Sequence, residues 1–274
     1  MTATQITYDV ADRTAVITLD RPEARNGYTV QMADEIAQAL AEAEGDTGVR
    51  VVVLTGAGDD FCVGADLSSG RFTSPGEGSA GDWVEPASRV TRPMYELHKP
   101  VIAAVRGAAV GVGSTVILPA DFRIAADDSR FGFVFARRGI YPEGGSTWFL
   151  PRLVGLGRAT DWMISGRLIA ADEALASGLV TELQPADRVL DRALGLAAEL
   201  ADSVAPVSVA VIRQALRQMS ALPSPQPAFD LDSQLIAGCG ASPDAAEGIS
   251  SFLERRAPHF PRRVPDDLPD FLPW

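Results

Sequence analysis

The amino-acid sequence predicts an α/β fold, and three observations support that prediction. Strand-like and helix-like segments alternate over roughly the first 150 residues, as they do in proteins whose helices cover a largely parallel sheet. After about residue 155 the segments are helix-like and often rich in alanine. The chain of 274 residues is 46% hydrophobic and 22% charged, which is ordinary globular usage, so it can bury a substantial core.

The first elements are a strand, a helix and a buried strand. Residues 14–19 are rich in β-branched side chains and favour a strand. Residues 30–44 repeat apolar side chains at helical spacing, and Thr29 is placed to cap the first turn, so an amphipathic helix is expected. Residues 51–54 form a continuous apolar run between glycine-containing turns, which is typical of a strand covered on both faces.

The middle of the chain continues the alternation after a loop. Residues 68–86 concentrate Ser, Gly, Pro and Thr and predict a mobile loop that could cover a site. A helix over 86–98, a strand over 101–105 and a glycine-rich turn over 107–113 are expected next. A short helix over 114–118 and a strand over 122–125 complete this part.

The last third is expected to be mostly helical and to end in a proline-rich tail. The tail carries five prolines from Pro258 onward and ends in Phe271, Leu272 and Trp274. Such apolar ends favour packing along a surface, of this subunit or of a neighbour. The predicted helical segments are residues 158–165, 171–177, 188–204, 206–219 and 245–255.

Charge and targeting signals exclude several classes of protein. The formal net charge of -12 and the pI near 4.6 argue against a nucleic-acid or membrane partner. We find neither an apolar run of about 18 residues nor a basic, apolar N-terminal leader, so the expected compartment is the cytoplasm. Cys62 and Cys239 lie far apart and are expected to be free thiols.

The residues present also exclude common catalytic centres. The segment from Gly111 to Thr115 lacks the central serine of the hydrolase motif Gly-x-Ser-x-Gly. The two histidines, His98 and His259, are expected to be structural. With only two histidines and two cysteines, and no ligand spacing, no metal site is expected.

Two glycine-rich turns remain as candidate sites. The turn over residues 56–64 lacks the Lys-Ser/Thr ending of a phosphate-binding loop, and the turn over 111–116 lacks the third glycine of a dinucleotide fingerprint. Each follows a buried strand, so unbonded backbone N–H groups would point away from the sheet edge. If the two turns face each other, these groups could form an oxyanion hole.

These turns carry a resemblance to a known family. Residues 61–67 resemble the Phe-x-x-Gly-Ala-Asp-Leu signature of the crotonase (enoyl-CoA hydratase/isomerase) superfamily, and residues 21–26 resemble its Arg-Pro-Glu-x-Arg-Asn segment. The resemblance covers roughly residues 14–182. Further matches in the family's order and spacing are residues 100–107, Gly111, Gly113, Ala120, Asp121, Phe131, Gly132, Gly139 and residues 150–155.

The resemblance implies a fold, a ligand and an assembly. The expected fold is a crotonase-like spiral of ββα units over residues 1–200, followed by a helical oligomerisation region over 201–274. The expected ligand is an acyl-CoA substrate with no separate cofactor, and the expected assembly is a homotrimer or a hexamer. Local arginines and backbone N–H groups are expected to hold the phosphates of CoA.

The resemblance also assigns residues to roles. The N–H groups of Ala65 and Val112 are expected to hold the thioester oxygen. The family usually has glycine at the position of Val112, and a β-branched residue fits poorly wherever φ is positive. Residues expected to line the CoA groove are Ala24, Arg25, Gly64, Asp66 and Leu67.

The acid–base residues decide which reaction to expect. The two positions that carry glutamate in the family's hydratases are Thr115 and Phe135 here, so ordinary hydration lacks both carboxylates. Glu143 resembles the acid of family isomerases, which move a double bond from position 3 to position 2. Phe135 and Trp148 are expected to desolvate Glu143 and raise its basicity.

Two other functions stay open at this point. One is an enoyl-CoA hydratase whose acid–base group has moved, and the other is a non-catalytic acyl-CoA-binding protein. The predicted activity is 3-enoyl to 2-enoyl isomerisation, with Glu143 as base and Ala65 and Val112 as oxyanion donors.

Overall fold

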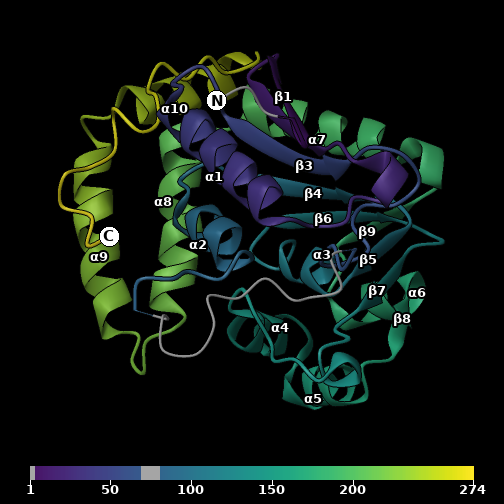
Figure 1. Ribbon diagram of the computed structural model, residues 1–274. Coiled ribbons are helices and arrows are strands. Elements are labelled where there is room, and N and C mark those ends of the chain that lie inside the picture. The colour runs from purple at the N-terminus through teal and green to yellow at the C-terminus, as the bar shows by residue number, and fades with distance from the viewer. Residues whose placement is uncertain (1–3, 69–80) are drawn as a thin grey trace.

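The computed structural model describes residues 4–68 and 81–274, and its main element is a six-stranded sheet (Figure 1). The first two strands pair antiparallel, and every later neighbour is parallel. In spatial order the strands are β1 (Ile6–Ala11), β2 (Thr14–Leu19), β3 (Val51–Gly56), β4 (Val101–Val105), β6 (Phe122–Ala126) and β9 (Glu182–Gln184). The predicted α/β class is thus confirmed.

A second, three-stranded sheet lies beside the first and completes the spiral. Its order is β5 (Ala108–Val110), β7 (Arg130–Gly132) and β8 (Leu168–Ala170). The strand β5 falls inside the segment predicted as one continuous glycine-rich turn, so that prediction was wrong over these three residues. Three residues are too few to show strand periodicity.

Helices cover both faces of the large sheet, with α1 and α7 on opposite sides (Figure 1). Alternate residues of β3 explain this: Val51 and Val53 pack with α7, whereas Val52 and Leu54 pack in the other cluster. The helices are α1 (Val30–Gly45), α2 (Ser88–Glu96), α3 (Val112–Thr115), α4 (Ser146–Val154), α5 (Leu156–Ser165), α6 (Ala171–Ser177), α7 (Val189–Ser203), α8 (Pro206–Met219), α9 (Gln226–Cys239) and α10 (Pro243–Glu254).

Several predicted elements are confirmed residue by residue. Thr29 caps α1, because its hydroxyl oxygen accepts from the N–H of Met32 at 3.0 Å. The helices α6 and α8 have the predicted bounds. The predicted mobile loop falls mostly on residues 69–80, which lie outside the described residues.

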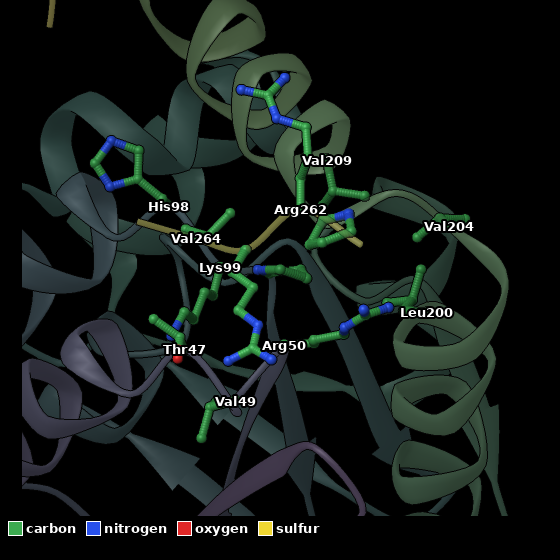
Figure 2. A pocket seen from close by; sticks show the side chains of 13 residues that line it. Thr47, Val49, Arg50, His98, Lys99, Leu200, Val204, Val209, Arg262 and Val264 are labelled. Carbon is green, nitrogen blue, oxygen red and sulfur yellow. The ribbon is translucent and has the colours of Figure 1, made fainter. Parts of the chain in front are cut away.

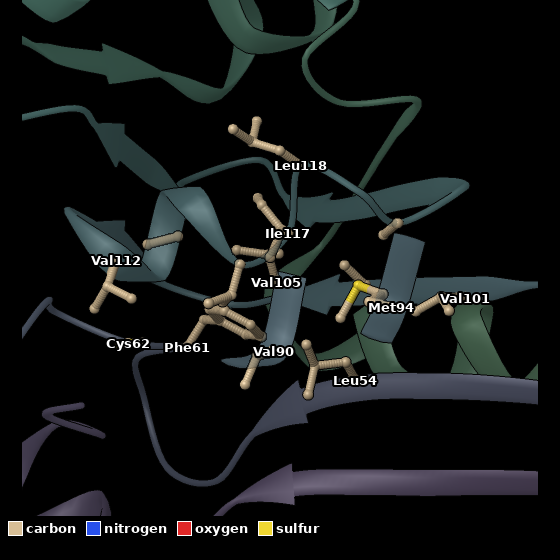
Figure 3. Packing of buried hydrophobic residues seen from close by; sticks show 14 of the residues in the cluster. Leu54, Phe61, Cys62, Val90, Met94, Val101, Val105, Val112, Ile117 and Leu118 are labelled. Atoms are coloured by element: carbon tan, nitrogen blue, oxygen red, sulfur yellow. The ribbon is translucent and has the colours of Figure 1, made fainter. Parts of the chain in front are cut away.

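Buried hydrophobic side chains pack against the two glycine-rich turns. Figure 3 shows Phe61 beside Val90 of α2. Cys62 and Val112 belong to the same cluster, and all four residues are fully or almost fully buried. Because this cluster also includes Val105 of β4, it connects the turns to the central sheet. Close packing of this kind leaves the backbone of the turns little freedom to shift.

The C-terminal part packs against its own chain. Val264 of the tail lies in a cluster with Val207, Ala210 and Val211 of α8. Figure 1 shows the tail running alongside α8 and α9. The predicted boundary at residue 200 falls inside α7, and a role of residues 201–274 in oligomerisation stays a prediction.

Two arginines join α8 to the core. Arg213 and Arg217 both pair with the carboxylate of Asp121, at 2.8 and 2.9 Å. Arg213 also donates to the carbonyl of Met94 at 2.8 Å, at the end of α2. These contacts attach α8 to Asp121 and to the end of α2.

Candidate active site

The two glycine-rich turns lie against each other. Cys62 exchanges backbone hydrogen bonds with its neighbours, donating to the carbonyl of Ala108 at 2.9 Å and accepting from the N–H of Val110 at 3.0 Å. A Cβ atom on Gly64 would lie 3.2 Å from the carbonyl oxygen of Val110. The expectation that the two turns face each other is therefore met in the structure.

Each turn presents backbone N–H groups that are not used in secondary structure. Among the described residues, the N–H groups of Ala65 and Val112 have no hydrogen-bond acceptor, and neither do those of Gly64 and Gly113 beside them. Val112 is the first residue of α3, where the N–H has no partner within the helix. Gly111 takes the positive φ of +57°, so the valine that follows carries no backbone strain.

Both residues line one cavity of about 570 Å³, a size suited to a small-molecule ligand. The predicted site residues found on its wall are Arg25, Gly64, Ala65, Leu67, Val112 and Glu143. The wall also holds residues that were not predicted as site residues, among them Arg130, Val134, Arg137, Arg138, Ile140 and Leu168. The adjacent arginines at 137 and 138 are a weak signal, because such pairs also occur at 255–256 and 262–263.

Two predicted groove residues do not line this cavity. Ala24 ends a short 3-10 turn, Pro22–Ala24, and its carbonyl accepts from the N–H of Gly27 at 2.9 Å. The carboxylate of Asp66 accepts from the N–H of Ser68 at 2.9 Å and pairs with Arg21 at 2.9 Å. These bonds, from Ser68 first and then Arg21, lower the pKa of Asp66 to about 2. Asp66 thus fixes the shape of the turn.

Arg25 lines the cavity, and one edge of its guanidinium is paired with a carboxylate. Its Nε donates to the carboxylate of Asp60 at 2.7 Å, while 64% of its side chain stays exposed. Arg25 also adopts a left-handed backbone conformation, with φ of +51°. An exposed guanidinium paired on one edge keeps further N–H donors for an anion.

Glu143 is the carboxylate of the cavity. It is half-buried, and burial together with the nearby charge of Glu85 raises its pKa to about 7. It precedes two glycines with positive φ, Gly144 and Gly145. A Cβ on Gly144 would lie 2.5 Å from Cγ2 of Thr115, so only glycine lets the turn approach α3 this closely.

The two positions that hold glutamate in hydratases are buried here. The hydroxyl of Thr115 donates to the carbonyl of Gly111 at 3.3 Å, and Phe135 contributes an apolar wall to the cavity. The expectation that Trp148 would help to desolvate Glu143 was wrong. Trp148 packs against Tyr95 and under the guanidinium of Arg152. It lies outside the cavity, because its side chain is on a face of α4 that points away from Glu143.

The raised pKa of Glu143 predicts a pH-dependent loss of stability. A carboxyl group whose pKa is higher in the folded state binds its proton more tightly when the protein is folded. Glu143 therefore adds to the free energy of unfolding below about pH 4.5, and this contribution is lost as the pH rises through about 7. Relative to Glu143→Gln, the wild type is expected to lose up to about 3 kcal/mol of unfolding free energy between pH 5 and 8.5. Urea unfolding of both proteins at the two pH values measures this difference, and an equal change in both would contradict it.

A second hollow in the molecule is too small to hold a substrate. Figure 2 shows Arg50, Lys99 and Arg262 around a space of about 20 Å³, which is enough for one water. The ammonium of Lys99 donates to the carbonyls of Ala43 and Asp46 at 2.5 and 2.6 Å, at the end of α1. This basic cluster therefore serves the packing of the chain.

The two histidines lie away from the cavity. Nδ1 of His98 lies 2.6 Å from Glu44, and neither His98 nor His259 lines the cavity. Within residues 4–68 and 81–274 no group of three or more His, Cys, Asp or Glu side chains could hold a metal ion. No single helix in the same ranges is long and apolar enough to cross a membrane; two consecutive segments, Ala186–Ser203 and Pro206–Met219, pass that test only as a pair bent by 113°.

The chain is similar over most of its length to proteins of one family. The family model described as enoyl-CoA hydratase/isomerase matches residues 10–263. Enoyl-CoA hydratase ACTT3 of Alternaria alternata is 38% identical over 251 residues, which is 91% of this chain and 83% of that protein. The 1,2-epoxyphenylacetyl-CoA isomerase of Escherichia coli is 34% identical over 89% of this chain and 93% of its own.

Solved structures show the same fold. The crystal structure of an enoyl-CoA hydratase from Bacillus anthracis has a TM-score of 0.85 and 31% sequence identity, and the match covers 94% of this chain and 99% of that one. The resemblance drawn from residues 14–182 thus extends over nearly the whole chain. This chain belongs to the enoyl-CoA hydratase/isomerase family, the crotonase superfamily.

Proposed function

We propose that this protein converts 3-enoyl-CoA thioesters into 2-enoyl-CoA thioesters. The ionised carboxylate of Glu143 removes a proton from C2, and the electron pair moves through the thioester to give a dienolate. The N–H groups of Ala65 and Val112 hydrogen-bond the negative oxygen. The carboxylic acid of Glu143 then returns the proton to C4, which leaves the double bond between C2 and C3.

One observation carries this proposal. Glu143 is the only carboxylate among the described residues that line the cavity, and it shares that cavity with the unbonded N–H groups of Ala65 and Val112. A double-bond shift needs one carboxylate, whereas hydration by the family's usual route needs two. A pKa near 7 suits a group that must both take and return a proton at neutral pH.

The CoA part of the substrate is proposed to lie along the remaining wall. Arg25, Arg130, Arg137 and Arg138 all line the cavity and supply local positive charge to a chain whose net charge is -12. Gly64 and Leu67 would contact the pantetheine. A homotrimer or hexamer in the cytoplasm remains our expectation, supported by the exposed apolar side chains of Ile212 and Leu216 on α8.

The pH dependence of turnover tests this proposal. Because Glu143 must be ionised to remove a proton, kcat/KM for a 3-enoyl-CoA is expected to fall about tenfold per pH unit below about pH 7 and to level off above it. The rise in absorbance of the conjugated 2-enoyl thioester measures the rate. A flat profile between pH 5 and 8 would contradict the role of Glu143 as the base. Binding without turnover would contradict the proposed activity and favour a non-catalytic binder.

Hydration is the second candidate, because several relatives are named hydratases. It would require a carboxylate besides Glu143 to act on the water. Loss of crotonyl-CoA absorbance with formation of the 3-hydroxy thioester measures this activity. A value of kcat/KM for crotonyl-CoA hydration above that for 3-enoyl-CoA isomerisation would assign the protein as a hydratase.

A further inference from the structure

The carboxylate of Glu85 connects the start of α2 to the turn that carries Glu143. Its Oε1 accepts from the N–H of Gly144 at 2.7 Å and from the N–H of Ser88 at 2.8 Å. Its Oε2 accepts from the N–H of Ala87 at 2.7 Å, and the hydroxyl of Ser88 also donates to Oε1. Both oxygens are thus engaged by donors at the start of α2 and in the neighbouring turn.

Tyr28 continues the connection toward the turn that carries Ala65. Its backbone N–H donates to the carbonyl of Gly64 at 2.8 Å, and its carbonyl accepts from the N–H of Asp66 at 2.9 Å. Its hydroxyl donates to the carbonyl of Pro86 at 3.2 Å, and the residue is 4% exposed. A continuous set of contacts therefore runs from Ala65 through Tyr28 to the segment that contains Glu85.

The turn after Glu143 needs such support. Gly144 and Gly145 both have positive φ, and adjacent glycines are the most conformationally free residues of a chain. Packing against Thr115 limits the position of Gly144 on one side, and the bond from its N–H to Glu85 limits it on another. Misplacing a reacting group by about 1 Å can cost about 100-fold in rate.

We propose that Glu85 is a positioning residue that holds the Glu143 turn at a fixed place relative to Ala65. Its position also has an electrostatic consequence, because its negative charge disfavours ionisation of Glu143. The proposal rests on the proposed function for its kinetic part. Glu85 does not line the cavity and all its described contacts are to α2 and the turn, so it acts through Glu143 and not on the substrate.

The electrostatic part follows from the surroundings of Glu143. Burial is the larger cause of its raised pKa, and the charge of Glu85 is the second. Tyr28 and Cys62 are the other titratable groups near Glu143. The pKa of each is raised, chiefly by burial and in part by the carboxylate of Glu143. The charged side chains on the cavity wall are Arg25, Arg130, Arg137 and Arg138. Removing the charge of Glu85 therefore leaves Glu143 with no close negative neighbour among the described residues.

The test compares Glu85→Gln, which keeps an acceptor for Gly144 but removes the charge, with Glu85→Ala, which removes both. Carbon-13 NMR of protein labelled at glutamate Cδ follows the titration of Glu143, whose signal is assigned by its absence in Glu143→Gln. Glu85→Gln is expected to lower the Glu143 midpoint by about half a pH unit or more. Glu96→Gln, at the exposed far end of α2, serves as the matched control and is expected to leave that midpoint unchanged.

Kinetics test the positioning part. With 3-enoyl-CoA at pH 8.5, Glu85→Ala is expected to lower kcat by about 10- to 100-fold with KM changed less than about threefold. Glu85→Gln is expected to restore most of that loss. Tyr28→Phe, which removes the hydrogen bond to the carbonyl of Pro86, is expected to lower kcat by a smaller factor than Glu85→Ala.

The outcomes separate this inference from the proposed function. An unchanged Glu143 midpoint in folded Glu85→Gln, together with wild-type kcat in Tyr28→Phe and in Glu85→Ala, would overturn the role of Glu85. If Glu85→Ala does not fold, Glu85→Gln and Tyr28→Phe decide the result. If Glu143→Gln turns over normally while the Glu143 midpoint still falls in Glu85→Gln, the proposed function fails and the electrostatic role of Glu85 stands.

Discussion

Glu143→Gln is expected to lower kcat for 3-enoyl-CoA isomerisation by about 10²- to 10⁴-fold, the range that one general acid–base group contributes. Glutamine has nearly the same shape but cannot accept a proton from C2 at neutral pH. KM is expected to change little, because the proposed CoA contacts lie elsewhere on the cavity wall, at Arg25 and Leu67. Initial rates with saturating 3-enoyl-CoA measure the effect.

The matched control for this variant is Glu96→Gln. It makes the same chemical change on an exposed side chain of α2, and it is expected to keep wild-type rates. Circular dichroism and the melting temperature serve to check that Glu143→Gln is folded. Equal turnover by wild type and folded Glu143→Gln would remove Glu143 from the mechanism, whatever the activity of the control.

Val112→Pro is expected to lower kcat by about 10²- to 10³-fold, the effect of removing one donor from an oxyanion hole. Proline lacks the N–H that is proposed to bind the developing oxyanion. The first position of a helix tolerates proline well, because its N–H has no partner within the helix and its φ already suits proline. The change therefore removes one donor without breaking a hydrogen bond of the fold.

Val112→Ala separates the N–H from the side chain. Both variants lose the valine side chain, but only the proline variant loses the donor. Val112→Ala is expected to stay within about tenfold of the wild-type kcat, because a smaller core residue costs stability before it costs transition-state binding. Equal rates for folded Val112→Pro and Val112→Ala would show that this N–H does not hold the oxyanion.

Local patterns predicted many of the longer elements of the fold, because each of those carries its own signal, but not β1, α4 or α9. The apolar period of residues 206–219 and Pro206 at the first helical position define α8. The helix α9 is not among the predicted helical segments, although Pro227 lies in its first turn, where proline is favoured. The three-residue strands β5, β7, β8 and β9 were missed because backbone pairing with distant partners, and not side-chain pattern, creates them.

The sequence by itself determined the family, the two glycine-rich turns and the single candidate acid, because these depend on residue types at fixed spacing. Only the tertiary structure decided the environment of Glu143. It placed Phe135 and not Trp148 on the cavity wall, and it brought Glu85 to the N–H of Gly144, 59 residues further along the chain. Burial and neighbouring charge set the pKa of a carboxyl, and both depend on contacts between distant segments that no local pattern records.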